Sequence, residues 1–511
     1  MNEVQGKSAV MRSSPLKRFT LAIAALALIT AACSGYYPTR LRTGSSEKIE
    51  TQQAPPSNQD ATAPTTPDVG PSQATGSAQT AAPVNQPRKV LAKTSGGTTI
   101  TQGAGGLPVA DIWPASEDRV GISATEIKLC MHAAFALGAA FDNNPADEDV
   151  YFRRLNDAGG IFGRKVKIQF TDDAYVAAAT TEALNQCKNN NPFLYMGGVG
   201  FDQAPAGRSW AETNKLPYLF NLAVEATNLK YSFSFMPSIE RNGRTIGQFT
   251  GSRFAGKKVG VIYVDTDNWR AGYKEFEKEI VKRGMRVEPG QAHAITNNNH
   301  PDFGLIISQM QGAGVNLVLT YINALALNRF IIQADGQLYH PVILSPDGFD
   351  LVTDVAGNRP PSQYGSSGDG IDHMRNFPGI YASWVSPAYE MGPPAEKSRA
   401  SVPWFSEMQE MKAAYKKYGV KSDDRVNDVD WMFWLYSKTV HQMLTDCSKE
   451  CSRNILAGLM LTGYKTEIVG CGIDFSLGGG RVGGYNHNIY KSEPAGLRSY
   501  WRQIETCKSG F

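Results

Sequence analysis

The chain has 511 residues, a formal net charge of +3 and an apolar fraction of 42%. This apolar fraction suffices for a large buried core, so a wholly disordered protein is excluded. A net charge of +3 over this length is too small to indicate binding to nucleic acid.

Residues 1–33 are predicted to be a lipoprotein signal peptide. Lys17 and Arg18 precede residues 19–29, an apolar run that is shorter than the ~20 residues needed to span a bilayer. The run ends at Thr30-Ala31-Ala32-Cys33, which resembles a bacterial lipobox and implies that Cys33 carries the lipid. The alternative is an ordinary A-x-A cleavage site with Cys33 incidental.

The charge excess lies in this signal. It holds four cations and one acid, which gives +3 and leaves the rest of the chain formally neutral: Lys7, Arg12, Lys17, Arg18 and Glu3. The basic balance therefore belongs to targeting and indicates nothing about a partner. Either Met1 or Met11 can be the start, because the residues between them add nothing that a signal needs.

Residues 34–118 are predicted to be a disordered tether. From Thr51 to Arg88 the chain is mostly Ala, Pro, Gln, Ser and Thr, with Val69 and Val84 as its only large apolar residues. Such a stretch cannot bury enough apolar surface to offset its ordering entropy. The segment reads as a spacer between a membrane anchor and a folded body, and a cleaved pro-segment is the alternative.

From about Arg119, strand-like runs alternate with helical patterns, which is typical of parallel α/β sheets covered on both faces. The predicted strands are residues 127–131, 166–170, 193–196, 216–220, 258–264 and 316–320. The predicted helices are residues 147–156, 177–187, 204–213, 243–253, 271–283, 303–312, 324–334 and 429–443. About 390 residues suit two doubly wound α/β lobes joined by a hinge. We place the first lobe at residues 119–237 and 380–475, and the second at 238–379 and 476–511.

The sequence lacks the common catalytic and metal-binding motifs. No GxSxG, HExxH, Walker A or paired CxxC pattern occurs, and the seven histidines include no i,i+4 pair. The acidic run Asp147-Glu148-Asp149 is interpreted as a helix start, where the helix dipole favours negative charge, with a calcium site as the alternative. We predict no enzyme activity, no cofactor and no metal.

Six cysteines remain besides Cys33. Export places them in an oxidising compartment, where they can form disulfides. Proximity in the sequence favours the pairs Cys130–Cys187, Cys447–Cys451 and Cys471–Cys507 among the possible pairings. A catalytic thiol is the alternative, but no histidine lies in a recognisable partner motif.

Five motifs then follow one another in order. They are the glycine turn of residues 156–165, the Asp-Asp-Ala-Tyr strand end at 172–175, the glycine-rich loop 197–200, and the strand segments 214–219 and 256–262. Together they resemble the type I periplasmic solute-binding proteins of the leucine/isoleucine/valine class. The resemblance runs in order from about Arg119 to the end of the chain.

This resemblance implies an extracytoplasmic substrate-binding lipoprotein of an ABC-type importer. Such a protein captures a small polar solute, an amino acid or a related amide or organic acid, between two lobes and delivers it to a membrane permease. The implied partners are the solute, the ABC permease and, through the lipid on Cys33, the membrane; no nucleic acid is expected, and the protein is expected to be a monomer. The alternative is an envelope-anchored sensor or scaffold of the same fold without a transport role.

The resemblance also places ligand contacts in the loops that follow the strands. In the first lobe these are His132, Phe135, Gly200, Phe201, Asp202, Ala223 and Glu225. In the second lobe they are Trp269, Asn323 and Asp347, with Asp350 as a further candidate. For His132 a packed and satisfied histidine is the alternative; Trp269 is either a loop lid over a planar ligand or surface packing.

The amino-acid members hold the ligand's ammonium group with a second-lobe carboxylate. The resemblance places that carboxylate in Thr320-Tyr321-Ile322-Asn323-Ala324-Leu325, which contains no acid. A buried ammonium without a counter-charge is unfavourable by several kcal/mol. Either Glu225, Asp202 or Asp347 supplies the charge, or the ligand is not a standard amino acid.

Overall fold

The structure is a computed structural model that describes residues 89–509, apart from residues 95–96, 136–143, 199, 201, 221–228, 299, 347–372, 385–403, 423–425, 427, 467–470, 480, 485 and 496–497. The predicted signal, Cys33 and residues 34–88 lie outside the described residues. Val84–Phe511 form one compact unit. In the described part of the chain, no helix combines the length and the apolar character needed to cross a membrane.

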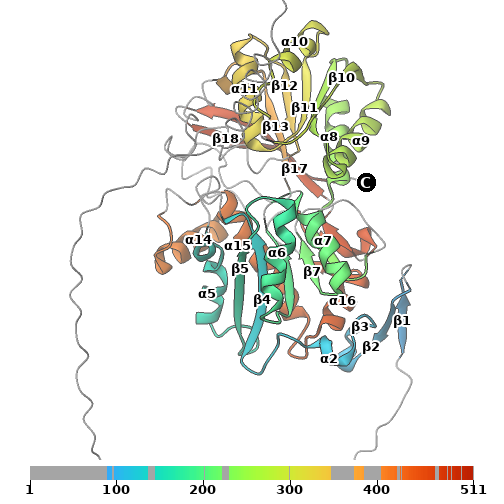
Figure 1. Cartoon of the computed structure of the whole chain (residues 1–511), viewed down its shortest axis with the longest axis vertical. Helices are drawn as coiled ribbons and strands as arrows, with labels where there is room; N and C mark the ends of the chain where they lie inside the picture. The colour runs from blue at the N-terminus through green and yellow to red at the C-terminus, as the bar shows by residue number, and fades with distance from the viewer. Residues whose placement is uncertain are drawn as a thin grey trace, which may run out of the picture. The chain divides into compact units, whose positions relative to one another are not determined.

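The first lobe is built on a six-stranded parallel sheet with the order β16-β8-β7-β6-β4-β5 (Figure 1). Its strands are β4 (Glu126–Ala133), β5 (Lys165–Asp172), β6 (Leu194–Gly197), β7 (Tyr218–Phe220), β8 (Ser232–Pro237) and β16 (Val482–Gly484). Its helices are α4 (Pro145–Glu148), α5 (Val150–Asp157), α6 (Ala177–Lys188), α7 (Gln203–Asn214), α14 (Phe405–Tyr418), α15 (Asp428–Asp446) and α16 (Arg453–Leu461). The predicted alternation of strands and helices is confirmed.

Helices cover both faces of this sheet. Successive side chains of a strand point to opposite faces, so each strand packs against helices on both sides. Leu129 and Met131 of β4 pack in the core that contains side chains of α5, α14 and α15. The intervening Cys130 packs on the other face with Leu184 of α6 and Trp210 of α7. The strands are therefore buried on both sides, as expected for a parallel sheet.

The second lobe is built on a seven-stranded sheet with the order β10-β9-β11-β12-β13-β17-β18. The first five strands in this order are parallel, whereas β17 is antiparallel to β13 and to β18. The strands are β9 (Val259–Val264), β10 (Val287–Ile295), β11 (Leu317–Tyr321), β12 (Val342–Ser345), β13 (Ile380–Trp384), β17 (Asn486–Ala495) and β18 (Arg498–Ser509). The helices are α8 (Ile239–Arg253), α9 (Asp267–Val281), α10 (Gly304–Gly312) and α11 (Ala324–Gly336).

Glycines let α8 and α9 approach closely. A Cβ atom on Gly243 would lie 2.2 Å from the carbonyl oxygen of Gly272, and one on Gly247 would lie 2.5 Å from Cβ of Glu279. Non-bonded atoms do not approach to such distances, so this packing requires glycine at both positions of α8. The helical pattern of α8 was predicted from the sequence, but its role in close packing was not.

The prediction of a tether over residues 34–118 is wrong for its last part. Residues 90–110 form an antiparallel sheet of β1 (Val90–Lys93), β2 (Thr99–Gln102) and β3 (Pro108–Ala110), followed by α2 (Ala115–Asp118). Ile100 and Trp113 are buried, and Asn454 of α16 accepts hydrogen bonds from the backbone N–H groups of Ile112 and Trp113. The biased composition stops at residue 88, and the apolar residues after it dock on the first lobe.

Two segments differ from the predicted lobe boundaries. Strand β13, assigned from sequence to the first lobe, pairs with β12 and β17 in the second sheet. Strand β16, assigned to the second lobe, pairs with β8 in the first sheet. The chain thus passes from the first lobe to the second between β16 and β17, at residues 484–486, some ten residues later than the predicted boundary. The boundary was misplaced because β16 pairs with the edge of β8, and sequence periodicity alone does not reveal which strands pair.

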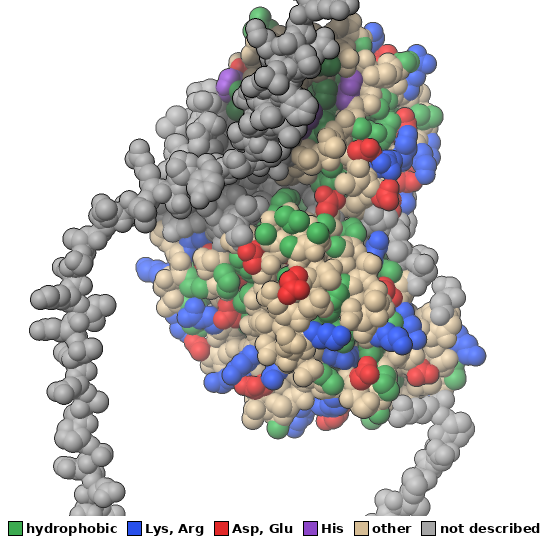
Figure 2. Space-filling view, in the orientation of Figure 1, with side chains coloured by type: hydrophobic (Ala, Val, Ile, Leu, Met, Phe, Trp, Pro, Cys, Tyr) green, Lys and Arg blue, Asp and Glu red, His purple; other side chains and the backbone are tan. Residues whose placement is uncertain are grey.

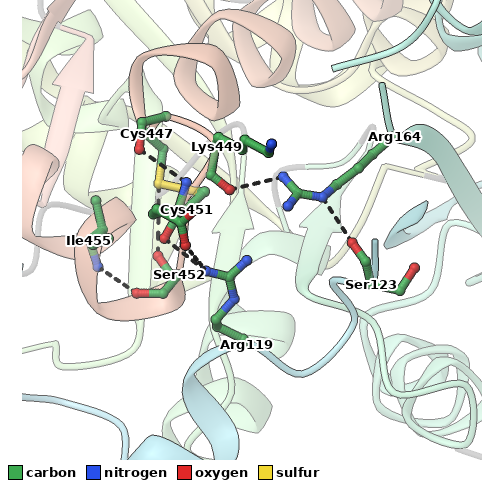
Figure 3. Close-up of polar contacts among 10 residues, drawn as sticks. Arg119, Ser123, Arg164, Cys447, Lys449, Cys451, Ser452 and Ile455 are labelled. Atoms are coloured by element: carbon green, nitrogen blue, oxygen red, sulfur yellow. Dashed lines mark hydrogen bonds and ion pairs between the residues drawn. A yellow bond between two sulfur atoms is a disulfide. The ribbon is translucent and has the colours of Figure 1, made fainter. Parts of the chain in front are cut away.

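The three disulfides join the pairs that sequence proximity favoured, Cys130–Cys187, Cys447–Cys451 and Cys471–Cys507. The first links β4 to α6, and the second links the end of α15 to the start of α16. Figure 3 shows the turn closed by Cys447–Cys451, where Arg164 donates from Nε to the carbonyl of Ser123 and from Nη1 to that of Lys449. Arg119 donates to the carbonyl and carboxylate of Glu450 on the same turn. Both of these disulfides lie within the first lobe.

Charges of both signs are interspersed on the surface. Figure 2 shows lysine and arginine side chains among aspartate and glutamate on the face in view, without a large block of one sign in the described residues. This matches the formally neutral balance of the chain after residue 33.

Candidate functional site

The predicted ligand contacts follow strands at the carboxyl ends of the two parallel sheets, where open α/β sheets bind ligands. In the first lobe the described contacts follow β4 and β6, and in the second they follow β9 and β11. Phe201, Ala223, Glu225, Asp347 and Asp350 lie outside the described residues. Their predicted roles stay predictions.

His132 lies at the end of β4 in a buried polar network. Its Nδ1 is 2.7 Å from Oδ2 of Asp173, and its Nε2 is 2.7 Å from the hydroxyl of Tyr218. Burial, followed by the charge of Asp173, raises the pKa of Tyr218 well above its usual value, so the phenol stays neutral and donates to His132. His132 then carries its proton on Nδ1 and donates to Asp173. Both ring nitrogens are used, which is the packed and satisfied arrangement that was the alternative to ligand binding.

Two glycines make room for the hydroxyl of Tyr218. A Cβ atom on Gly197 would lie 2.5 Å from this oxygen, and one on Gly207 would lie 2.3 Å from it. Asp173, the second acid of the Asp-Asp motif, also accepts a hydrogen bond of 2.9 Å from the backbone N–H of Tyr175. The glycine loop and the Asp-Asp motif therefore support one buried network that connects the carboxyl ends of β4, β5 and β6.

Phe135 follows the same strand and is partly buried. Its ring meets that of Phe170 edge to face, with 5.7 Å between the ring centroids. Gly200, after β6, has φ of +132°, and a Cβ atom there would lie 2.0 Å from Oε1 of Gln203. Glycine is required at this position, because a side chain would suffer both backbone strain and overlap.

Asp202 brings the first lobe into contact with the second. It precedes α7 but does not cap it. Its Oδ1 accepts a long hydrogen bond of 3.4 Å from the hydroxyl of Thr266, which precedes α9. Burial raises the pKa of the Asp202 carboxyl above its usual value, and hydrogen bonds from Thr266 and Trp269 oppose this shift. A partly buried carboxyl between the lobes is thus held by neutral donors, which leaves it suited to a cationic group.

Trp269 lies in the first turn of α9, so the expectation of a loop residue is wrong. Helix α9 begins at Asp267, four residues before the predicted start. The indole is 1% exposed, and its ring meets that of Tyr321 edge to face at a centroid distance of 6.1 Å. Trp269 is therefore a fixed side chain beneath the contact of Asp202 with the second lobe.

Asn323 caps α11, a local role that sequence analysis did not assign to it. Its side-chain oxygen accepts a hydrogen bond of 3.0 Å from the backbone N–H of Ala326, as expected of an N-cap. Its backbone N–H donates to Oδ1 of Asn298 over 2.7 Å. The side-chain amide is therefore fixed at the end of β11, next to Tyr321.

The connection between the lobes contains buried polar side chains that sequence analysis missed. We define the hinge by Pro237 and Ser238 between β8 and α8, and by Gly484 at the end of β16. Pro237 and Gly484 pair in the sheet, and a Cβ atom on Gly484 would lie 2.3 Å from the nitrogen of Pro237. Arg241 is fully buried and donates from Nη1 to the carbonyl of Gly484 over 2.8 Å. One side chain of α8 thus ties the passage between β8 and α8 to the passage between β16 and β17.

His487 lies next to this hinge at the start of β17. Burial, together with the nearby charge of Arg241, lowers the pKa of His487 to about 3. Its Nδ1 is 3.4 Å from the hydroxyl of Thr245 on α8. The imidazole is therefore neutral at physiological pH. No local sequence pattern marked these buried side chains, because Arg241 is one of three arginines in α8.

The acidic run Asp147-Glu148-Asp149 lies at a helix start, as predicted, with Asn144 as the cap of α4. A lysine provides the positive charge at the position considered for calcium. Lys421 Nζ lies 2.9 and 3.0 Å from the two carboxylate oxygens of Asp430 and 3.5 Å from Oδ2 of Asp147. Among the described residues, no group of three or more His, Cys, Asp or Glu side chains is arranged to hold a metal ion.

Comparisons with known proteins agree with this architecture. Residues 148–357 match the family model described as periplasmic binding protein. The Leu/Ile/Val-binding protein homolog 1 of Brucella abortus (strain 2308) is 24% identical over 174 residues, which cover 32% of this chain and 45% of that protein. The chain therefore matches less than half the length of this relative.

Solved structures share the fold at low sequence identity. A fatty acid ABC transporter substrate-binding protein from Thermomonospora curvata has a TM-score of 0.56 at 14% identity, over 76% of this chain and 94% of its own. A solute-binding protein from Rhodopseudomonas palustris BisB5 in complex with 3,4-dihydroxybenzoic acid has a TM-score of 0.56 at 16% identity, over 75% and 98%. A branched chain amino acid ABC transporter from Thermus thermophilus with bound valine has a TM-score of 0.56 at 12% identity, over 76% and 97%. These likenesses show that the two-lobed fold is shared.

Proposed function

We propose that this chain acts as a periplasmic binding protein, which captures a small polar solute between its two lobes and delivers it to an ABC-type importer; the match of residues 148–357 to the periplasmic binding protein family and the shared two-lobed fold support the proposal. The observation that carries the proposal is the contact of Asp202 with Thr266, which brings together the carboxyl ends of the two sheets. The hinge of Pro237, Ser238 and Gly484 supplies the axis about which such lobes close. No bond-making step is part of this function.

The proposed solute is an amino acid or a related amide or organic acid. Asp202 supports the amino-acid class, because its carboxyl is partly buried and its pKa is raised by that burial. A bound ammonium would favour the ionised form of Asp202 and would replace the second-lobe carboxylate missing from residues 320–325. The names of the structural relatives include valine and a hydroxylated benzoic acid, so the same fold serves both ligand types.

A thermal-shift screen of the chain without residues 1–33 tests the proposal. Amino acids, amides, ureas, short peptides and aromatic acids are added one class at a time. A solute at a hundredfold excess over its Kd adds about 2.7 kcal/mol to the free energy of unfolding, because it binds only the folded state. If no class raises the melting temperature, the proposal is wrong.

The Asp202→Asn variant separates the ligand classes. For a solute with an ammonium group we expect an affinity loss of about tenfold or more, because the replacement removes its counter-charge. Asp111→Asn, an exposed change in the docked N-terminal segment, is the matched control. If the best ligand is an aromatic acid and Asp202→Asn leaves its affinity unchanged, the organic-acid class is favoured instead.

The proposal includes a lipid anchor at Cys33 and an extracytoplasmic location. Support comes from the basic and apolar signal and from the family match, whose members act outside the cytoplasm. Labelled palmitate should be incorporated by the wild-type chain and not by Cys33→Ser. An equally labelled Cys33→Ser chain would exclude Cys33 as the anchor.

A further inference from the structure

The disulfide Cys471–Cys507 differs from the other two, because it joins the two lobes. Cys471 precedes β15 (Ile473–Asp474), which pairs with β14 (Lys465–Thr466) and belongs to the first lobe. The side chain of Ile473 reaches β16: a Cβ atom on Gly483 would lie 2.5 Å from its Cγ2. Cys507 lies on β18 at the edge of the second sheet.

This disulfide encloses the β16–β17 passage of the hinge. The loop that it closes spans 36 residues and contains Gly484, where Arg241 clasps the chain. On the second-lobe side, Cys507 is held beside the start of β17, where its backbone N–H donates to Oδ1 of Asn488 over 3.1 Å. The Cα atoms of the two cysteines are 5.1 Å apart. The covalent link therefore crosses from lobe to lobe close to the passage about which the lobes turn.

A hinge made only of peptide passages permits a wide range of rotation, whereas a short covalent link beside it does not. A disulfide keeps its Cα atoms within about 7 Å of each other. This distance limits any opening of the lobes that moves β18 away from the β14–β15 pair. The lobes can then rotate relative to each other only about the disulfide itself.

We propose that Cys471–Cys507 is a strap that limits how far the two lobes open and thereby slows the release of bound solute. The effect on release rests on the proposed function, but the effect on opening does not. The other two disulfides cannot act in this way, because each joins elements of the first lobe alone. Exposure also separates them: Cys130, Cys187, Cys447 and Cys451 are 0 to 3% exposed, whereas Cys471 and Cys507 are partly exposed.

The test compares two double variants of the full chain, Cys471→Ser/Cys507→Ser and the control Cys447→Ser/Cys451→Ser. Genetically encoded spin labels at Glu182 on α6 and Lys278 on α9, both exposed, report the distance between the lobes without using cysteine. In the solute-free protein, loss of the strap should shift the distribution to longer and broader distances, and the control should match the wild type. An unchanged distribution in the strap variant overturns the proposal.

Solute release is measured on the same proteins by stopped flow, with the best ligand of the thermal-shift screen. Loss of the strap should raise the dissociation rate roughly three- to tenfold, while the control changes it little. A wider distribution with an unchanged dissociation rate overturns the role in release. If no solute binds any of the proteins, the proposed function fails, whereas the distance measurement still decides the strap.

If the strap variant fails to fold, the wild-type protein provides the second measurement. A small dithiol should reduce the partly exposed Cys471–Cys507 disulfide first. The dithiol gives up two electrons and two protons and becomes a cyclic disulfide, and Cys471 and Cys507 become free thiols. Mass spectrometry after thiol alkylation identifies the reduced pair. The same shift in lobe distance is expected at the concentration that reduces Cys471–Cys507 alone, and its absence there overturns the proposal.

Discussion

The two lobes share one architecture but bury different chemistry. In the first lobe, Lys421 pairs with Asp430 and Asp147, and these three side chains are 0 to 1% exposed. In the described part of the second lobe, at least one partner of each ion pair keeps 24% or more of its side chain exposed. There, the buried Arg241 is held by a backbone carbonyl, and glycines let α8 pack closely against α9. The first lobe thus buries ion-paired side chains, whereas the described ion pairs of the second lobe lie at its surface.

We expect the largest loss of stability when the buried lysine of the first lobe is replaced. Lys421→Met leaves the carboxylates of Asp430 and Asp147 buried without their cation, so we expect a loss of about 3–5 kcal/mol in the free energy of unfolding by urea. Lys417→Met is the control, because its pair with Asp157 is more than half exposed on both sides. A loss from Lys421→Met as small as that of the control would remove the contrast between the lobes.

Steric fit in the second lobe is tested by Gly243→Ala. The new Cβ atom would lie 2.2 Å from a backbone oxygen of α9, so we expect a loss of about 1–3 kcal/mol. Gly312→Ala, at the end of α10, has open space around the added atom and should be neutral or stabilising by up to about 1 kcal/mol. Equal effects of the two changes in urea unfolding would show that the α8–α9 contact relaxes.

The hinge should make stability depend on pH through His487. Its folded pKa is about 3, below the ~6.5 of an unfolded histidine. The unfolded state therefore binds a proton first, and stability that is complete above pH 6.5 is lost as the pH falls from 6.5 towards 3. The slope is about 1.4 kcal/mol for each pH unit within this window. His487→Gln should reduce the loss between pH 7 and 5 in urea unfolding; an unchanged loss contradicts the assignment.

The smallest expected effect lies on the surface of the second lobe. Lys278→Ala removes an i,i+3 ion pair with Glu275 on α9, in which Lys278 is 65% exposed. We expect a loss of about 0.2–0.5 kcal/mol that shrinks with added salt. A loss comparable to that of Lys421→Met would mean that exposure does not separate the two lobes.

Local patterns predicted much of the fold, since the strands and helices of residues 127–213 and 243–334 follow from periodicity, apart from β10, which was not predicted. Neighbouring cysteines also gave the three disulfide pairs. The buried pairs were not accessible in the same way: His132 meets Asp173 and Tyr218, which lie 41 and 86 residues away. The partner of a polar side chain at such a separation depends on strand order, which no local pattern contains.

For the candidate site, the sequence predicted where residues lie along the chain better than it predicted what their side chains do. Sequence analysis located Trp269 and Asn323 at strand ends, but it did not show that the first is buried in a helix and the second is a cap. Strand β8 was missed although Ser232-Phe233-Ser234-Phe235 alternates polar and apolar residues; all six of its residues, including both serines, are buried. The N-terminal sheet was missed because the tether composition next to it was extended too far.

That N-terminal sheet determines where mechanical load enters the protein. If Cys33 is the anchor, the connecting segment is residues 34–88, which at full extension spans at most roughly 190 Å. A pull along it reaches β1 first and loads the antiparallel pairing of β1 with β2. The force passes next to β3, which is seated against α16, where a Cβ atom on Gly458 would lie 2.3 Å from the carbonyl oxygen of Pro108. The small sheet thus lies between residue 88 and the first lobe, so that a pull from the N-terminal side loads it before the lobes.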